Sequence, residues 1–263
     1  MVFGNNIHIR PPAVAGQFYP KNSMELRKLI KNFLDQQPDN LFIPQKIKSF
    51  IVPHAGYIYS GPIATAVYKI LSLSNWQPEK IILIGPSHYL PIADFVFSSA
   101  DYWETPLGKI SLLKPPLNGP FNDLAFQKEH SLEVQLPFLQ TILKNFKILP
   151  ILINNEVESG NLAVLIKPIL DEATLLIISS DLSHYLPLEM AQKIDKKTHQ
   201  IILQLKINEK DKLEVCGAAA ILTLMHLAKK LDWKTKLIAY QTSFETSGDK
   251  ETVVGYGTYL FYQ

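Results

Sequence analysis

Three short apolar runs in this chain each end in a polar tip that carries a histidine. The tips hold His54, His88, and the pair Asp181 and His184. Imidazole suits iron, copper and zinc, and carboxylates and thiolates complete the ligand set of such ions. If the three tips meet in space, the sequence predicts one active or metal-binding pocket, formed by residues far apart in the chain.

Cys216 is a further candidate ligand, although a lone cysteine is often only a small core residue. Gly217 follows it at an expected helix start, where the partial positive charge of the backbone amides would favour the thiolate. His130 and Glu133 are weaker candidates for the same site. They either cap a helix start at the surface, or reach the pocket and tune the protonation of a bound ligand. Asp181 has two interpretations as well, direct ligation or orientation of His184.

The three runs have the composition of strands that are buried on both faces. They begin at Phe50, Ile81 and Leu175 and contain Ile, Val and Leu without polar alternation, which is typical of parallel strands covered by helices. In open α/β sheets, ligands bind beyond the carboxyl ends of the strands. We therefore expect an α/β fold with a mostly parallel or mixed central sheet, helices on both faces, and the histidine tips at one edge.

Other elements follow from periodicity and from turn residues. Residues 10–20 predict an ordered surface arm, since they are rich in proline and glycine. The expected helices span residues 23–37, 60–71 with Pro62 in the first turn, 129–144 with a kink or a break at Pro137, 159–170, 188–205, and from 215 onward. The further strands are expected at residues 93–100, 109–113, 146–153, 237–242 and 253–262. No segment resembles a linker, so a single domain over residues 1–263 is the simplest organisation.

The composition excludes several classes of protein. The 263 residues include 26 Lys and Arg against 24 Asp and Glu, a net charge of +2, which gives no electrostatic reason to expect a nucleic-acid partner. No run approaches the roughly 20 apolar residues of a membrane-spanning helix. One cysteine cannot form an intramolecular disulfide, and no secretory signal is recognisable, so we expect a cytoplasmic protein.

The motifs taken together resemble those of a known family. They are Pro53-His-Ala-Gly-Tyr57, Gly85-Pro-Ser-His88, Glu129-His-Ser-Leu-Glu-Val-Gln-Leu-Pro137, Ser179-Ser-Asp-Leu-Ser-His184 and Cys216-Gly217, with the arm at residues 13–20 and the closing Val253-Val-Gly-Tyr256. This set, in order over nearly the whole chain, resembles the Memo family, whose prokaryotic members are called AmmeMemoRadiSam system protein B.

The resemblance implies a fold similar to the class III extradiol, non-haem iron dioxygenases. It implies His54, His88 and Cys216 as metal ligands, with Asp181 and His184 lining the same pocket. It also implies iron or copper as the metal, with zinc as a further possibility, and redox chemistry. The prokaryotic name implies association with a radical-SAM protein and an AMMECR1-like protein. Residues 218–220 are all alanine, whereas the animal relative carries bulkier and basic residues there.

Three functional hypotheses follow. The first is a metal-dependent redox protein, for which extradiol ring cleavage is an analogy from fold alone. The second is a non-catalytic binding or partner protein with a vestigial dioxygenase-like pocket, because no phosphate loop or dinucleotide motif is present. The third is a cysteine hydrolase with Cys216 as nucleophile, His184 as base and Asp181 as orienting carboxylate. The sequence does not name the small-molecule or peptide ligand.

Overall fold

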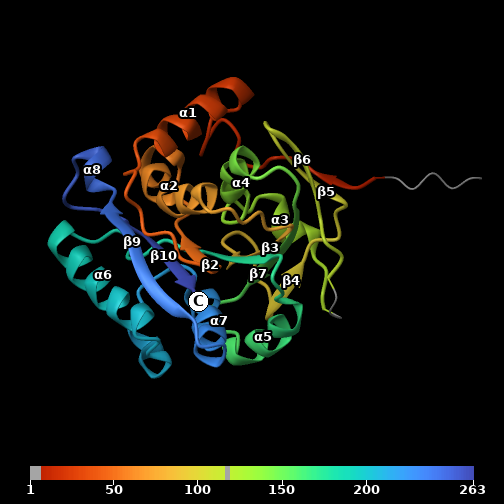
Figure 1. Cartoon of the computed structure of the whole chain (residues 1–263). Coiled ribbons are helices and arrows are strands. Elements are labelled where there is room, and N and C mark those ends of the chain that lie inside the picture. The colour runs from red at the N-terminus through yellow and green to blue at the C-terminus, as the bar shows by residue number, and fades with distance from the viewer. Residues whose placement is uncertain (1–6, 116–118) are drawn as a thin grey trace, which may run out of the picture.

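A mixed seven-stranded sheet forms the centre of the molecule (Figure 1). The computed structural model describes residues 7–115 and 119–263. Along the sheet the order of strands is β4 (Phe95–Phe97), β7 (Lys147–Ile153), β3 (Lys80–Pro86), β8 (Thr174–Ser179), β2 (Ile47–Val52), β10 (Gly255–Tyr262) and β9 (Lys234–Thr242).

The four central strands, β7, β3, β8 and β2, are parallel. β10 runs antiparallel to β2 and β9, and β4 runs antiparallel to β7. Every residue of β8 is buried, and so are six of the seven residues of β3, because both faces of these strands are covered. The predicted α/β class with a mostly parallel or mixed sheet is confirmed.

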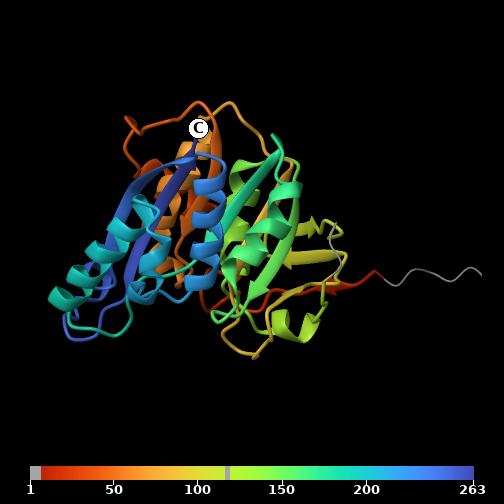
Figure 2. The ribbon, with the colours of Figure 1, turned by 90° about the horizontal axis from the view of Figure 1, so that it is seen from below.

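Helices cover both faces of the sheet (Figures 1 and 2). On one face, α1 (Ser23–Asp35), α2 (Tyr57–Leu73) and α4 (Leu136–Ile142) share a core with the sheet. On the other face, α5 (Ser159–Ile166), α6 (Leu188–Leu203) and α7 (Ala218–Lys230) form the second core. Two short helices, α3 (Asp123–Gln127) and α8 (Phe244–Ser247), lie in connecting segments. Within the described residues, every helix is too short or too polar to span a bilayer.

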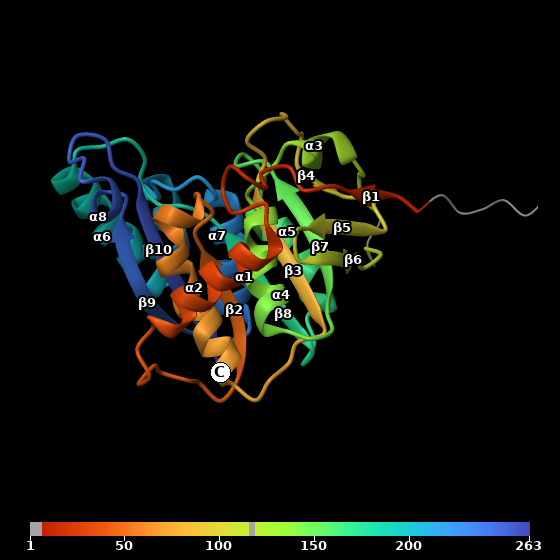
Figure 3. The ribbon, with the colours of Figure 1, turned by 90° about the horizontal axis from the view of Figure 1, so that it is seen from above.

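A second, three-stranded sheet lies beside the first (Figure 3). It consists of β1 (Ile9–Arg10), β5 (Tyr102–Thr105) and β6 (Gly108–Ser111), with β1 parallel to β5 and β6 antiparallel to it. The guanidinium of Arg10 stacks over the ring of the buried Trp103 of β5, at 4.2 Å from the ring centroid. This contact fixes the beginning of the predicted arm against the body of the protein.

The segment expected as one helix over residues 129–144 has a different structure. α4 begins only at Leu136, after a 3₁₀ turn at Glu133–Gln135, and Pro137 lies in its first turn. Proline is tolerated there because the first amides of a helix have no intrahelical acceptor. The predicted kink or break at Pro137 is therefore found as a break, whereas a helix beginning at residue 129 is wrong: residues 129–132 are non-helical, which matters for the site.

The start of α2 also differs from prediction. The helix begins at Tyr57, after Gly56, so that Pro62 lies inside it. Proline has no amide hydrogen to donate to the carbonyl of Ile58 one turn earlier. That carbonyl instead accepts a hydrogen bond from the Thr246 hydroxyl at 3.4 Å, which compensates for the missing helical bond.

Elsewhere the strands near residues 93–113 are shorter than expected, and β5 was not predicted.

Gly255 provides a test of packing between β10 and α6. A Cβ built there would lie 2.0 Å from Oδ2 of Asp195, whose buried carboxylate accepts hydrogen bonds from the Ser183 amide and the Tyr240 hydroxyl. We expect Gly255→Ala to lower the free energy of unfolding by about 1–3 kcal/mol through overpacking. Denaturant unfolding measures this change.

The control is Gly160→Ala in α5, where the nearest atoms would lie 3.8 Å from the new Cβ. This variant should be at least as stable as the wild type. Equal stability of the two variants would contradict the predicted contact between Gly255 and Asp195.

Candidate metal site

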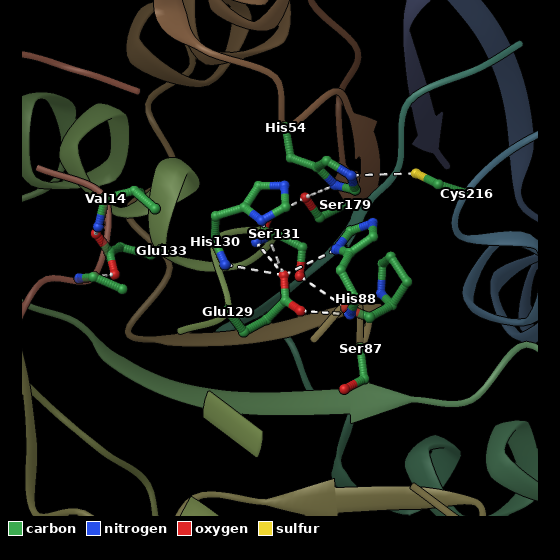
Figure 4. A network of polar contacts seen from close by, with 12 residues as sticks. Val14, His54, Ser87, His88, Glu129, His130, Ser131, Glu133, Ser179 and Cys216 are labelled. Atoms are coloured by element: carbon green, nitrogen blue, oxygen red, sulfur yellow. Dashed lines mark hydrogen bonds and ion pairs between the residues drawn. The ribbon is translucent and has the colours of Figure 1, made fainter. Parts of the chain in front are cut away.

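Three histidines from separate segments converge beyond the carboxyl ends of the parallel strands (Figure 4). His54 follows β2, His88 follows β3, and His130 lies between α3 and α4. The ring centroids of His88 and His130 lie 4.7 Å apart, and His54 lies 5.1 Å from the first and 5.4 Å from the second. One nitrogen from each ring lies within 4.8 Å of the others. This arrangement could hold a metal ion.

His54 is buried, and its hydrogen bonds determine its tautomer. Its Nδ1 lies 3.1 Å from the Ser179 hydroxyl. That hydroxyl donates its own hydrogen to the Ser131 carbonyl and accepts one from Nε2 of Gln135. The oxygen can therefore only accept from His54, so Nδ1 carries the proton and Nε2 has a free lone pair. A lone pair on Nε2 is what a metal ligand requires.

Glu129 holds His88 in the same manner. Its carboxylate accepts hydrogen bonds from the His88 amide at 2.6 Å and from His88 Nδ1 at 3.0 Å, and from the amides of His130 and Ser131. Burial raises the pKa of Glu129, but the hydrogen bonds from His88 outweigh burial and lower this pKa to about 2. An ionised carboxylate behind an imidazole orients the ring and increases its basicity toward a metal.

His130 completes the cluster and has an unsatisfied nitrogen. Its Nδ1 is buried and makes no hydrogen bond, although it lies 3.4 Å from Glu129 Oε1. Burial lowers the pKa of His130 to about 4, against the opposing charge of Glu129. The ring of Phe18 packs against it with centroids 4.7 Å apart. His130 is thus a neutral imidazole at neutral pH, the state in which histidine binds metals.

Cys216 precedes α7 and reaches the edge of this cluster. Its Sγ lies 3.2 Å from Nε2 of His54 and accepts a hydrogen bond from the Asp181 amide at 3.1 Å. Burial raises the pKa of the Cys216 thiol, and the charge of Asp181 raises it further. Burial and the charge of Asp181 thus oppose the thiolate that the helix start was expected to favour. The imidazole beside the sulfur is that of His54, whereas the cysteine-hydrolase hypothesis requires His184.

Asp181 and His184 lie near the histidine cluster, but they do not belong to the group of three side chains that could hold a metal ion. Oδ1 of Asp181 accepts the amide hydrogen of His54 at 2.7 Å. Burial raises the pKa of this carboxyl to about 7, despite that hydrogen bond. His184 is half-buried, and its ring centroid lies 5.8 Å from that of Tyr185. Asp181 thus positions the backbone of His54.

Glu133 points away from the histidines (Figure 4). Its carboxylate forms a buried ion pair with Arg10 at 2.6 Å and accepts hydrogen bonds from the amides of Ala13 and Val14 and from the Tyr19 hydroxyl. The structure therefore supports neither interpretation of Glu133, since its side chain does not reach the pocket and is buried, not exposed at a helix start. It anchors the arm at residues 10–20.

Three residues of the site were not singled out as site residues from the sequence. Glu129 accepts hydrogen bonds from His88, Ser179 bonds to His54, and Gln135 donates to the Ser179 hydroxyl; all three are buried. The Glu129-His130 dipeptide was a visible signal for the first of them. Ser179 and Gln135 fall within the quoted motifs, but nothing local shows what they contact, because their partners are distant in the chain.

Comparison with known proteins places these features in a family. The profile described as Memo-like protein matches residues 10–260. A MEMO1 family protein of Aquifex aeolicus is 38% identical over 97% of this chain and 100% of its own length. A MEMO1 family protein of Nitrosopumilus maritimus is 34% identical over 96% of this chain and 99% of its own length. Both similarities extend over nearly the whole of each chain.

A solved structure is similar in fold. An uncharacterized protein of Escherichia coli K12 superimposes with a TM-score of 0.50 at 10% sequence identity, over 81% of this chain and 99% of the other. At that identity the similarity bears on architecture alone.

Proposed function

Because this chain belongs to the family of Memo-like proteins, we propose that it binds iron or copper at the histidine cluster and acts in metal-linked redox chemistry. The observation that supports this proposal most strongly is the convergence of His54, His88 and His130 within ligand distance of one another. Three imidazoles suit iron, copper and zinc. Iron and copper supply one-electron chemistry, which zinc does not.

The residues around the cluster fit a bound cation. His54 and His88 each have Nδ1 engaged by a partner, which leaves Nε2 available. Cys216 is a candidate ligand beside His54, because its Sγ lies 3.2 Å from Nε2 of His54 and binding of a cation there would displace the thiol proton. We propose His54, His88 and Cys216 as ligands, as the motifs imply, and add His130 from its position in the cluster. Asp181 and His184 would line the pocket and act on a bound substrate.

The test is the metal content of protein purified without oxygen and without a metal-binding tag. Mass spectrometry should find iron or copper near one equivalent, and Cys216→Ser should lower it. An oxygen-consumption screen of the loaded protein then tests redox activity. Protein that is free of metal, and stays so after reconstitution with each ion, would overturn the proposal in favour of a non-catalytic partner protein.

Glu129→Gln tests the carboxylate behind His88. The amide retains an oxygen that can accept the backbone hydrogen bonds, but it lacks the charge that increases the basicity of the imidazole. We expect metal affinity to fall about 10- to 100-fold, measured by competition with a chromogenic chelator. Asp171→Asn, which alters an exposed carboxylate ahead of β8, should leave affinity unchanged. Unchanged affinity in Glu129→Gln would show that its charge does not act on the metal.

We further propose that residues 1–263 form one domain that acts in the cytoplasm with a radical-SAM protein and an AMMECR1-like protein. Pairing of β2 with β10, from distant parts of the chain, supports the single domain. The partners rest on the family resemblance of the motifs. Sedimentation of the purified proteins, alone and mixed, tests the association, and unchanged sedimentation on mixing would contradict it.

A further inference from the structure

A groove of about 920 Å³ lies at the opposite end of β3 and β7 from the histidine cluster. It is bounded by the first residues of these strands, by β6, and by the segment that follows α4. Four lysines and one acidic residue line it, namely Lys80, Lys109, Lys144, Lys147 and Glu79. The lining therefore has a net positive charge, although the whole chain is nearly neutral.

Three of the four lysines have no acidic partner. Lys80 pairs with Asp171. Among the residues that the structure describes, Lys109, Lys144 and Lys147 form no ion pair. Lys80 and Lys147 are also direct partners in the parallel pairing of β3 with β7. Like charges directly opposite each other repel. Asp171 supplies a counter-charge to Lys80, and an anionic group bound in the groove would supply one to Lys147.

The groove also offers apolar side chains and a strand edge. Ile110 and Leu143 are buried beneath it, and Phe146 is half-buried. Three consecutive residues of β6, Lys109 to Ser111, line the groove. Successive side chains of a strand point to opposite faces, so consecutive residues can share one groove only where it runs along the edge of the strand. β6 is the edge strand of its sheet, and this edge is open only before Leu112, because Leu112 and Leu113 already bridge to Ile148 of β7.

An extended, acidic polypeptide matches these features better than a nucleic acid does. A peptide can add beside an edge strand through main-chain hydrogen bonds while its alternate side chains meet lysines or the apolar floor. Single-stranded nucleic acid requires several aromatic rings for base stacking, and the lining has only Phe146. It also has no arginine, since the two arginines of the chain are Arg10 and Arg27. We propose that this groove binds an acidic, partly apolar segment of a partner protein.

The test measures binding of a fluorescein-labelled peptide of alternating glutamate and valine to the full chain at low salt. The groove variant is Lys109→Glu, Lys144→Glu, Lys147→Glu. The matched control is Lys193→Glu, Lys196→Glu, Lys197→Glu, which makes the same change of charge at exposed positions of α6. We expect the groove variant to bind about tenfold more weakly than the wild type, from the loss of three exposed ion pairs, and the control to bind as the wild type does.

Circular dichroism and thermal unfolding verify that both variants fold. Absence of peptide binding by the wild type, or equal weakening in both variants, would overturn the proposal. It would also be overturned if oligothymidylate of equal charge bound more tightly than the peptide and lost that binding in the groove variant, since the groove would then be a nucleic-acid site. Because the groove and the histidine cluster lie at opposite ends of the strands, the result does not depend on the metal.

Discussion

His88→Ala is expected to remove bound metal almost completely. The substitution deletes one of the three imidazoles of the cluster and also leaves the ionised Glu129 without its partner ring. Loss of a residue that only orients a ligand already costs about 10- to 100-fold in affinity, so loss of a ligand should cost at least about 100-fold. Metal content after dialysis, together with chelator competition, measures the effect.

His226→Ala in α7 is the control for this substitution. His226 lies beside Gly160 of α5, outside the cluster, and its removal should leave metal content unchanged. Thermal unfolding must show that His88→Ala is folded when it is assayed. Wild-type metal content in folded His88→Ala would exclude His88 as a ligand.

Glu133→Ala is expected to cause the largest loss of stability among single substitutions of acidic residues. It leaves the Arg10 guanidinium buried without a counter-charge and removes the acceptor for the Ala13 and Val14 amides and the Tyr19 hydroxyl. Breaking a buried ion pair in this way costs about 3–5 kcal/mol. Chemical unfolding should show a lower midpoint.

The arm also connects this ion pair to the site. Arg10 donates a hydrogen bond to the Glu129 carbonyl at 2.7 Å, and Phe18 packs against His130. We therefore expect Glu133→Ala to lower metal affinity as a secondary effect. Glu209→Ala, which breaks the exposed pair of Glu209 with Lys212, should change stability little. Equal midpoints for the two variants would contradict the anchoring role of Glu133.

The architecture of the sheet and the location of the site could be predicted from local sequence. Runs of Ile, Val and Leu without alternation specify strands covered on both faces, and the structure places them side by side as β3, β8 and β2. Parallel strands present their carboxyl ends at one edge, so His54 and His88 had to lie near each other. The ordered set of motifs was likewise sufficient to recognise the family.

The roles of Glu129 and Glu133 depended on the tertiary structure. In the expected helix these residues, four positions apart, would share one face. The backbone from 129 to 132 is instead non-helical, so Glu129 reaches His88 whereas Glu133 reaches Arg10. Pro137 marked a break in helical periodicity, but the direction of each carboxylate depends on long-range partners, which no local pattern encodes.

The neighbours of His130 and Cys216 depended on tertiary packing as well. His130 joins the cluster because the ion pair of Glu133 and the hydrogen bonds of Glu129 hold its segment against the strand ends. Cys216 meets His54 because the start of α7 packs against the end of β8, where the Gly217 amide donates to the Ser180 hydroxyl. The sequence by itself determined the central parallel strands, the candidate ligands His54 and His88, and the end of the strands at which they lie. Packing between distant segments decided which side chains face one another there, because their contacts join residues far apart in the chain.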